Sequence, residues 1–91
     1  MNKPDIVAAV ARSSGISKTS ANTAVEEVFA AITDALRKGE DVRLVGFGTF
    51  STRRRAARQG RNPRTGETIQ IPASTQPKFK AGRPLKDAVN G

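Results

Sequence analysis

The sequence predicts one small α+β domain of three helices and three strands, in the order helix, helix, strand, strand, strand, helix. Apolar residues recur every three or four positions over 3–14 and again over 18–38, which is the spacing of amphipathic helices. Short runs between residues 41 and 80 alternate apolar and polar side chains, with the period of a strand. A turn signal at 62–66 separates two such runs and predicts a long hairpin over 52–77.

The first helix is expected over residues 3–14. Pro4 suits the first turn because its missing N–H costs nothing there, and Asp5 complements the positive end of the helix dipole. Gly15 fits a C-terminal cap. The apolar side of this helix consists of Ile6, Val7 and Val10.

The second helix is expected over roughly 18–38, with Ser17 as its N-cap. Arg37 and Lys38 match the negative dipole end, and Gly39 follows as the stop. The short connection implies that the two helices are antiparallel. The predicted buried face consists of Ala21, Val25, Val28, Phe29, Ile32 and Leu36.

The strands follow the second helix. Residues 41–45 alternate as a half-buried strand, 46–48 interrupt it, and 49–51 resume as a strand that leads into the arginine-rich segment. Phe47 and Phe50 are expected in the core and in a dimer contact, because the chain has no other large apolar residues to spare. On the return, Phe79 should point inward between the outward lysines Lys78 and Lys80. A last helix starting at 82–84 should bury Leu85, Ala88 and Val89.

The hairpin over 52–77 carries the chemistry of the chain. Six arginines lie between Arg53 and Arg64, with only small or polar residues among them. A solvated charge run is the simpler interpretation, but like charges repel and acidic partners are nearly absent, so the segment indicates a polyanion partner. Arginine forks match phosphate groups. Arg53 and Arg55 should share one strand face, with Arg54 on the other, so that the arm clasps a backbone from one side.

The charge is distributed unevenly. Residues 1–50 hold six basic and six acidic residues, whereas residues 51–91 hold ten basic and two acidic ones, so the whole net charge of +8 lies in the second half. This is typical of a polyanion-binding element on a neutral platform. Further candidate contacts are Lys3, Lys18, Lys80, Arg83 and Lys86, although a residue of this kind, taken alone, is more often an ordinary surface charge. Lys18 and Arg83 fall at predicted helix N-termini, where backbone amides also favour phosphate.

Composition limits the remaining possibilities. The core of a ninety-one-residue chain is small and usually needs a disulfide, a metal or a partner chain for stability. The chain has no cysteine or histidine, so neither a disulfide nor a Cys/His zinc site is available. We therefore expect a dimer. The absence of imidazole and thiol groups, and of acidic residues at metal-site spacing, argues against an enzyme, a cofactor and a metal. No apolar run approaches the roughly 18 residues of a membrane span, which favours a soluble, cytoplasmic protein.

Pro63 lies within the turn signal Asn62-Pro63-Arg64-Thr65-Gly66. Asn at the first position, Pro at the second and Gly at the fifth fit a type I turn followed by a left-handed glycine. Pro63 either only fixes this turn or also acts as an apolar wedge that unstacks a base step from the minor groove. The two interpretations are compatible.

Four stretches carry a resemblance to a known family. They are N-K-P-D-I-V at 2–7, V-G-F-G-T-F at 45–50, A-A-R-Q-G-R-N-P-R-T-G-E-T-I-Q-I-P-A at 56–73 and P-L-K-D-A-V at 84–89. Over essentially the whole chain they resemble the bacterial HU family of histone-like DNA-binding proteins, and the run at 60–73 is highly specific. One departure is the T-R-R-R run at 52–55, which is more basic than in members with an acidic residue there and predicts more salt-sensitive binding.

The resemblance implies an intertwined dimer with a helical base, a β-sheet saddle and two extended β-hairpin arms that reach around DNA through the minor groove. Residues 1–51 would form the base and the start of the saddle, 52–77 the arm, and 78–91 the end of the saddle and the last helix. Pro63 matches the family's intercalating proline. The other expected DNA contacts are Arg53, Arg55, Arg58, Arg61, Asn62, Arg64, Lys3, Lys18, Lys78, Lys80, Arg83 and Lys86. The expected dimer core is Phe29, Ile32, Leu36, Leu44, Phe47, Phe50 and Phe79.

The implied function is that of an architectural protein of the nucleoid. It would bind double-stranded DNA with little sequence preference, bend it, and prefer nicked, kinked or flexible DNA. A homodimer is expected, with a heterodimer of paralogues left open. Three alternatives remain: a sequence-specific subunit of the integration host factor type, an RNA-binding protein, and a secondary role as a surface adhesin or general polyanion binder.

Overall fold

The chain forms three helices and five strand segments, and a computed structural model describes residues 1–91. In chain order the elements are α1 (Lys3–Ser14), α2 (Lys18–Arg37), β1 (Val42–Leu44), β2 (Gly48–Arg55), β3 (Arg58–Arg61), β4 (Thr68–Ile71), β5 (Ser74–Ala81) and α3 (Arg83–Asn90). The predicted α+β class and the bounds of the first two helices are confirmed. None of the helices is long and apolar enough to cross a membrane.

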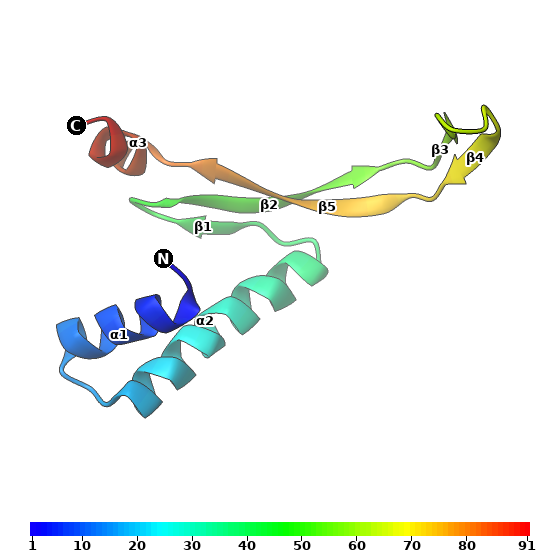
Figure 1. The fold of residues 1–91 in the computed structure, drawn as a ribbon. Helices are drawn as coiled ribbons and strands as arrows, with labels where there is room; N and C mark the ends of the chain where they lie inside the picture. Colours follow the sequence, from blue (N-terminus) through cyan, green and yellow to red (C-terminus); the bar gives the residue numbers. More distant parts are fainter.

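The protomer is extended. Its radius of gyration is 18.7 Å, against about 12 Å for a compact domain of this length. Figure 1 shows the cause: α1 and α2 lie on one side, and a long ribbon of strands runs out beyond them to a distant tip. A single copy therefore leaves much of its surface without cover from its own chain.

Both ends of α1 are fixed by local caps. The Asn2 side chain accepts a hydrogen bond from the Asp5 backbone N–H at 3.3 Å, and the Asp5 carboxylate accepts one from the Asn2 N–H at 3.0 Å. This capping box satisfies two backbone donors at the helix start. Gly15 ends the helix with a left-handed φ of 68°, as predicted. In α2, Ser17 is the N-cap and its hydroxyl accepts from the Ser20 N–H at 3.1 Å.

The buried core of the protomer lies between α1 and α2. Its side chains are Val7 and Ala11 from α1 and Ala21 and Val25 from α2. The prediction of a buried face along all of α2 is wrong for the single chain, since Phe29 is 46% exposed and Ile32 and Leu36 are only half-buried. Helix α1 is too short to cover all of α2, because its twelve residues extend about 18 Å whereas the twenty residues of α2 extend about 30 Å.

Strands β1, β2 and β5 form one antiparallel sheet in the order β1-β2-β5. A turn with φ of 86° at Gly46 connects β1 to β2. Strand β5 pairs with β2 over its full length, from Gly48 opposite Ala81 to Arg55 opposite Ser74. Helix α2 lies against β1 and β2, so one face of the sheet turns toward the helices.

The arm is a second ribbon, formed by β3 and β4. Two residues on each strand, 56–57 and 72–73, separate it from the β2–β5 pair, and the pairing register is the same on both sides of this break. The predicted hairpin over 52–77 is confirmed in its strand pairing, with a two-residue break in each strand that the sequence pattern did not indicate. Pro72 lies at the break and has no N–H to give to a ladder. Figure 1 shows the tip ribbon turned relative to the long one.

Helix α3 follows β5 at the opposite end of the sheet from the arm, apart from α1 and α2 (Figure 1). The predicted buried stripe of this helix is wrong for the single chain: Val89 is 77% exposed, Ala88 is exposed, and Leu85 is half-buried. No other helix of the same chain covers these side chains.

Candidate nucleic-acid interface

The three-stranded sheet has two chemically different faces. Side chains alternate along each strand, and the pairing register shows which of them share a row across the sheet. One face holds the apolar residues Val42, Leu44, Phe50, Phe79 and Ala81. The opposite face holds Arg43, Thr49, Ser51, Arg53, Arg55, Gln76, Lys78 and Lys80, and is called the basic face below.

An aromatic cluster fixes the apolar face. Phe50 and Phe79 are cross-strand partners with ring centroids 4.8 Å apart, and Phe47 lies 5.4 Å from Phe79. The prediction that Phe79 points to the apolar side is confirmed. Phe47 and Phe79 are still 46% and 43% exposed, so the cluster is incomplete in one chain.

None of the cations on the basic face forms an ion pair within the chain. Arg43, Thr49 and Lys80 form one cross-strand row, and Lys78 and Arg53 follow in the next rows toward the arm. The three ion pairs of the protein lie elsewhere: Lys3–Glu26, Arg37–Asp34 and Arg83–Asp87. A row of uncompensated ammonium and guanidinium groups on a rigid sheet creates a positive potential that favours an extended anion.

Two surface hollows are lined in part by residues of this face. Arg53, Arg54, Arg55, Ala56, Gln76 and Lys78 surround one of about 380 Å³. The other, of about 660 Å³, is lined by Thr49, Lys80, Ala81, Gly82, Arg83, Lys86 and Asp87. The predicted contacts Lys80, Arg83 and Lys86 are thus brought together. Arg83 also lies 3.9 Å from Asp87, so it is partly compensated.

Arg43 is a cation of the basic face that the sequence-based list of contacts lacks. Val42 and Leu44 alternate with it, so the apolar period already placed Arg43 on the opposite side of the strand. The strand order β1-β2-β5 puts Arg43 in the same row as Lys80, and the apolar alternation alone does not give this order.

The tip of the arm is a well-defined turn. The Gly66 N–H donates to the Asn62 carbonyl at 2.7 Å, and the Arg64 N–H donates to the Asn62 side chain at 2.9 Å. Gly66 has a left-handed φ of 75°, which confirms the predicted role of this glycine. Pro63 stands exposed at the end of the turn, where no ladder needs its missing N–H.

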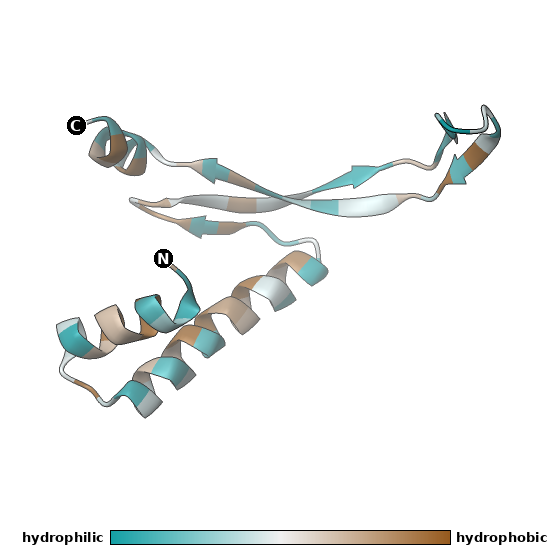
Figure 2. Cartoon of the chain, viewed as in Figure 1, coloured by the Kyte–Doolittle hydropathy of each residue, from teal (hydrophilic) through white to brown (hydrophobic).

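Arginines of the tip ribbon lie on both of its faces. Arg58 pairs with Ile71 and Gly60 with Ile69 on one face, whereas Gln59 pairs with Gln70 and Arg61 with Thr68 on the other. Arg58 and Arg61 are three positions apart and therefore lie on opposite faces of the tip ribbon, whereas the expectation of a one-sided clasp was based on Arg53 and Arg55. Figure 2 shows the apolar band in β4 within a mostly hydrophilic arm.

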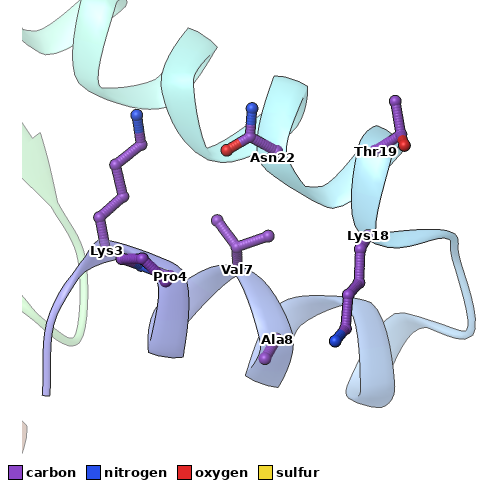
Figure 3. A pocket seen from close by; sticks show the side chains of 7 residues that line it. All are labelled: Lys3, Pro4, Val7, Ala8, Lys18, Thr19 and Asn22. Carbon is purple, nitrogen blue, oxygen red and sulfur yellow. The ribbon is translucent and has the colours of Figure 1, made fainter.

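Lys3 and Lys18 belong to the helical base and not to the basic face. They line a hollow of about 590 Å³ between α1 and α2, together with Pro4, Val7, Ala8, Thr19 and Asn22 (Figure 3). Lys3 Nζ lies 2.6 Å from Glu26 Oε1, and this hydrogen bond, followed by the lysine charge, lowers the pKa of Glu26 from its ordinary 4.5. Lys3 is thus compensated within the chain.

Comparison with known proteins agrees with this geometry. The family model described as "Bacterial DNA-binding protein" matches residues 1–90. The chain is 60% identical over 89 residues to DNA-binding protein HU of Geobacillus stearothermophilus, covering 98% of this chain and 99% of the relative. It is 55% identical over 91 residues to DNA-binding protein HU 1 of Bacillus subtilis (strain 168), covering 100% and 99%.

Solved structures show the same fold. The chain superposes on the Anabaena HU–DNA cocrystal structure with a TM-score of 0.89 and 42% identity, covering 98% of this chain and 97% of that one. For HU from Thermotoga maritima the TM-score is 0.69 at 31% identity, with 98% of each chain covered. The basic face, the arm and these full-length similarities lead to one conclusion: the chain belongs to the HU family of bacterial DNA-binding proteins.

Proposed function

We propose that two copies of this chain form a homodimer that binds double-stranded DNA with little sequence preference, bends it, and so helps to compact the nucleoid in the cytoplasm. The observation that carries this proposal is the basic face, whose cations continue into the arm without a carboxylate partner. Lysine, arginine and hydroxyl groups in this arrangement suit phosphates, which carry no sequence information.

The need for a second copy follows from the apolar surface. Only four apolar side chains are buried in the protomer, whereas Phe29, Phe47 and Phe79 are each more than two-fifths exposed. Such residues bury about 150–250 Å² each when covered, and they account for much of the stability of a core. The proposed dimer core is Phe29, Ile32, Leu36, Leu44, Phe47, Phe50 and Phe79.

Bending would come from the arms. The tip carries Pro63 at its exposed end, on a ribbon that extends beyond the helices. An apolar wedge of this kind unstacks a base step and kinks the duplex, at a cost of a few kcal/mol that a nick or a flexible step reduces. This supports a preference for nicked, kinked or flexible DNA.

Within this proposal each part of the chain has its own task. Residues 1–51 supply the dimer base and the start of the saddle, 52–77 the arm, and 78–91 the end of the saddle and α3. The proposed DNA contacts are Arg53, Arg55, Arg58, Arg61, Asn62, Pro63, Arg64, Lys3, Lys18, Lys78, Lys80, Arg83 and Lys86. Arg43 joins this set because it shares a row with Lys80.

A salt-dependent binding series on three short probes tests the proposal: an intact duplex, the same duplex with a nick, and a folded RNA. We expect a steep decrease of affinity with salt and the tightest binding to the nicked duplex. Tightest binding to RNA would overturn the DNA assignment, and equal affinity for nicked and intact DNA would remove the case for bending.

A panel of unrelated duplex sequences separates the proposal from site-specific binding of the integration host factor type. Near-equal affinities are expected across the panel. One duplex bound more than about a thousandfold tighter than the rest would point to the site-specific function, since specific recognition typically exceeds non-specific binding by that ratio or more.

A further inference from the structure

The tip ribbon, formed by β3 and β4, has few interactions that hold it together. Its strands pair only with each other, and the breaks at 56–57 and 72–73 separate them from the β2–β5 pair. An isolated two-stranded ribbon is marginally stable in water. One face of this ribbon is polar throughout and consists of Gln59, Arg61, Thr68 and Gln70. Apolar packing that stabilises the ribbon therefore has to come from the opposite face.

Two isoleucines of β4 lie on that opposite face, across from Gly60 of β3. Ile69 is the direct partner of Gly60, and Ile71 is its diagonal neighbour. The Ile71 side chain extends over Gly60, where an added Cβ would lie 2.7 Å from Ile71 Cδ1 and 3.6 Å from Ile69 Cγ1. Gly60 and Ile71 are the half-buried residues of the two strands, whose other residues are exposed. The Ile71 methyl group thus occupies the space that a side chain at residue 60 would need.

Space, and not backbone conformation, requires glycine at residue 60. The glycines with a left-handed φ are Gly15, Gly39, Gly46 and Gly66. Gly60 is not among them, so its backbone is one that alanine also adopts. A glycine inside a strand costs conformational entropy and offers no side chain to pack, and it often marks a close approach by another group. Here that group is the Ile71 side chain.

The contact lies close to the exposed proline of the tip. Pro63 follows Gly60 by three residues, which is about 10 Å along a strand. Strand pairing continues up to the turn, where the Asn62 N–H donates to the Glu67 carbonyl at 2.8 Å. The direction in which Pro63 projects is therefore set by the ribbon that carries it, and the ribbon is packed through Ile71 on Gly60.

We infer that Ile71, packed over Gly60, is a positioning residue that holds Pro63 in the orientation needed to enter a base step. This inference rests on the proposed bending by Pro63 and adds the contact that orients the wedge. A ribbon that is already ordered in the free protein does not have to be ordered on binding, which lowers the cost of insertion. Phosphate contacts require no such orientation, so loss of the packing should affect bending more than affinity.

Moving one methyl group across the ribbon tests the inference. Gly60→Ala adds the Cβ that meets Ile71 Cδ1 and forces this side chain out of its position. Ile71→Val removes Cδ1 and keeps a β-branched residue in the strand. In the double variant the new methyl group of residue 60 occupies the space left by Cδ1. Gln59→Ala is the matched control, because Gln59 is adjacent to Gly60 on the polar face of the same strand.

Single-molecule energy transfer between dyes at the ends of an intact duplex counts bent and straight complexes, and fluorescence anisotropy gives the affinity. We expect Gly60→Ala to lower the ratio of bent to straight complexes at least about fivefold, the effect of overpacking at the low end of its range. Ile71→Val should lower the ratio only about twofold, since it loses one partly buried methyl group. The double variant should recover to the level of Ile71→Val, and Gln59→Ala should match wild type.

Recovery in the double variant separates positioning from other roles of the two residues. A double variant that bends no better than Gly60→Ala would overturn the inference, because glycine would then be needed for close approach to the DNA itself. Ile71→Val bending as poorly as Gly60→Ala would also overturn it, because Ile71 would then act by touching the duplex. So would Gly60→Ala bending as well as wild type, or an affinity that falls more than the bent-to-straight ratio.

The contact itself is measured in the free full-length protein. Methyl-labelled isoleucine should give a nuclear Overhauser cross-peak between the Ile71 δ-methyl group and the Gly60 α-protons, and absence of this cross-peak would overturn the inference. Failure of the proposed function has a different signature: a wild-type protein that binds the duplex but leaves it straight contradicts the wedge at Pro63, whatever the variants do. Circular dichroism of each variant keeps unfolding separate from both outcomes.

Discussion

Phe50 and Phe79 are directly opposite each other on β2 and β5, with ring centroids 4.8 Å apart and ring planes tilted by 48°. The Phe79 ring also extends over Gly48, where an added Cβ would lie 2.6 Å from both the ring Cζ and the Lys80 carbonyl oxygen. The aromatic cluster and the cations on the opposite face use the same strands. The close packing of Phe79 and the β5 backbone on Gly48 therefore determines where Lys80 lies relative to β2.

Gly48→Ala should destabilise the protein by roughly 1–3 kcal/mol, because the methyl group displaces the Phe79 ring or the β5 backbone. Urea unfolding monitored by circular dichroism measures this loss. Ser51→Ala is the matched control, since Ser51 lies on the basic face of the same strand and its replacement should change stability by less than about 0.5 kcal/mol. A Gly48→Ala protein as stable as wild type would show that Phe79 can move freely.

Phe47→Ala should dissociate the dimer. Phe47 is 46% exposed in the protomer and contacts Phe79 at 5.4 Å, so its uncovered half is available to a second copy. Truncating a covered phenylalanine costs about 3–5 kcal/mol. Sedimentation velocity measures the oligomeric state, with Ser51→Ala as control because Ser51 lies on the basic face, opposite to the aromatic cluster. A Phe47→Ala protein that remains fully dimeric would contradict the assignment of Phe47 to the dimer core.

Local patterns predicted the helices well, because their signals are local. Pro4, Gly15 and Ser17 each act within one turn of their own position, and each was placed correctly from the sequence. The turn at Asn62 and Gly66 was predicted for the same reason. By contrast, burial of Phe29 and Val89 depends on what covers them, which periodicity does not specify.

The candidate site was predictable in composition but not in arrangement. The arginine-rich segment and Pro63 were identified from charge and turn chemistry, whereas the role of Arg43 needed the register of β1 on β2. Opposite faces for Arg58 and Arg61 follow from strand parity in β3. The break at Pro72 was not predicted, because a proline in a strand pattern signals an interruption without giving its length.

Arg58→Ala and Arg61→Ala should each weaken DNA binding uniformly across unrelated sequences and make the salt dependence shallower by about one unit of slope. Both lie on the tip ribbon without an ion pair. Fluorescence anisotropy at several salt concentrations measures the slope. Arg37→Ala is the control, because Arg37 pairs with Asp34 on the helical base. A changed preference among sequences would mean that the arginine contacts base edges and not phosphates.

Glu26→Gln should reduce stability at neutral pH but not in acid. The hydrogen bond from Lys3, followed by its charge, holds the pKa of Glu26 below its ordinary 4.5 in the folded state. A carboxylate with a lowered folded pKa stabilises the protein above the unfolded pKa, and this contribution is lost as pH falls through the folded pKa. The stability difference between wild type and variant should thus be constant near pH 7 and shrink below about pH 4.5.

Urea unfolding of both proteins across this pH range provides the measurement for Glu26. Glu27→Gln serves as its control, because Glu27 is the adjacent acidic residue and makes no ion pair. A difference between wild type and Glu26→Gln that persists unchanged to pH 3 would show that Glu26 acts through packing, independently of its charge.

Pro63→Ala should reduce DNA bending while keeping most of the affinity. The turn itself is held by hydrogen bonds to Asn62 from Gly66 and Arg64, so alanine leaves its geometry in place and removes only the exposed ring. Phosphate contacts supply most of the binding free energy, so affinity should fall less than about tenfold. Fluorescence transfer between dyes at the two duplex ends reports the bend. Pro84→Ala, in the first turn of α3 far from the arm, is the matched control. An unchanged bend in Pro63→Ala would show that Pro63 only forms the turn and that contacts of the arginines cause the bending.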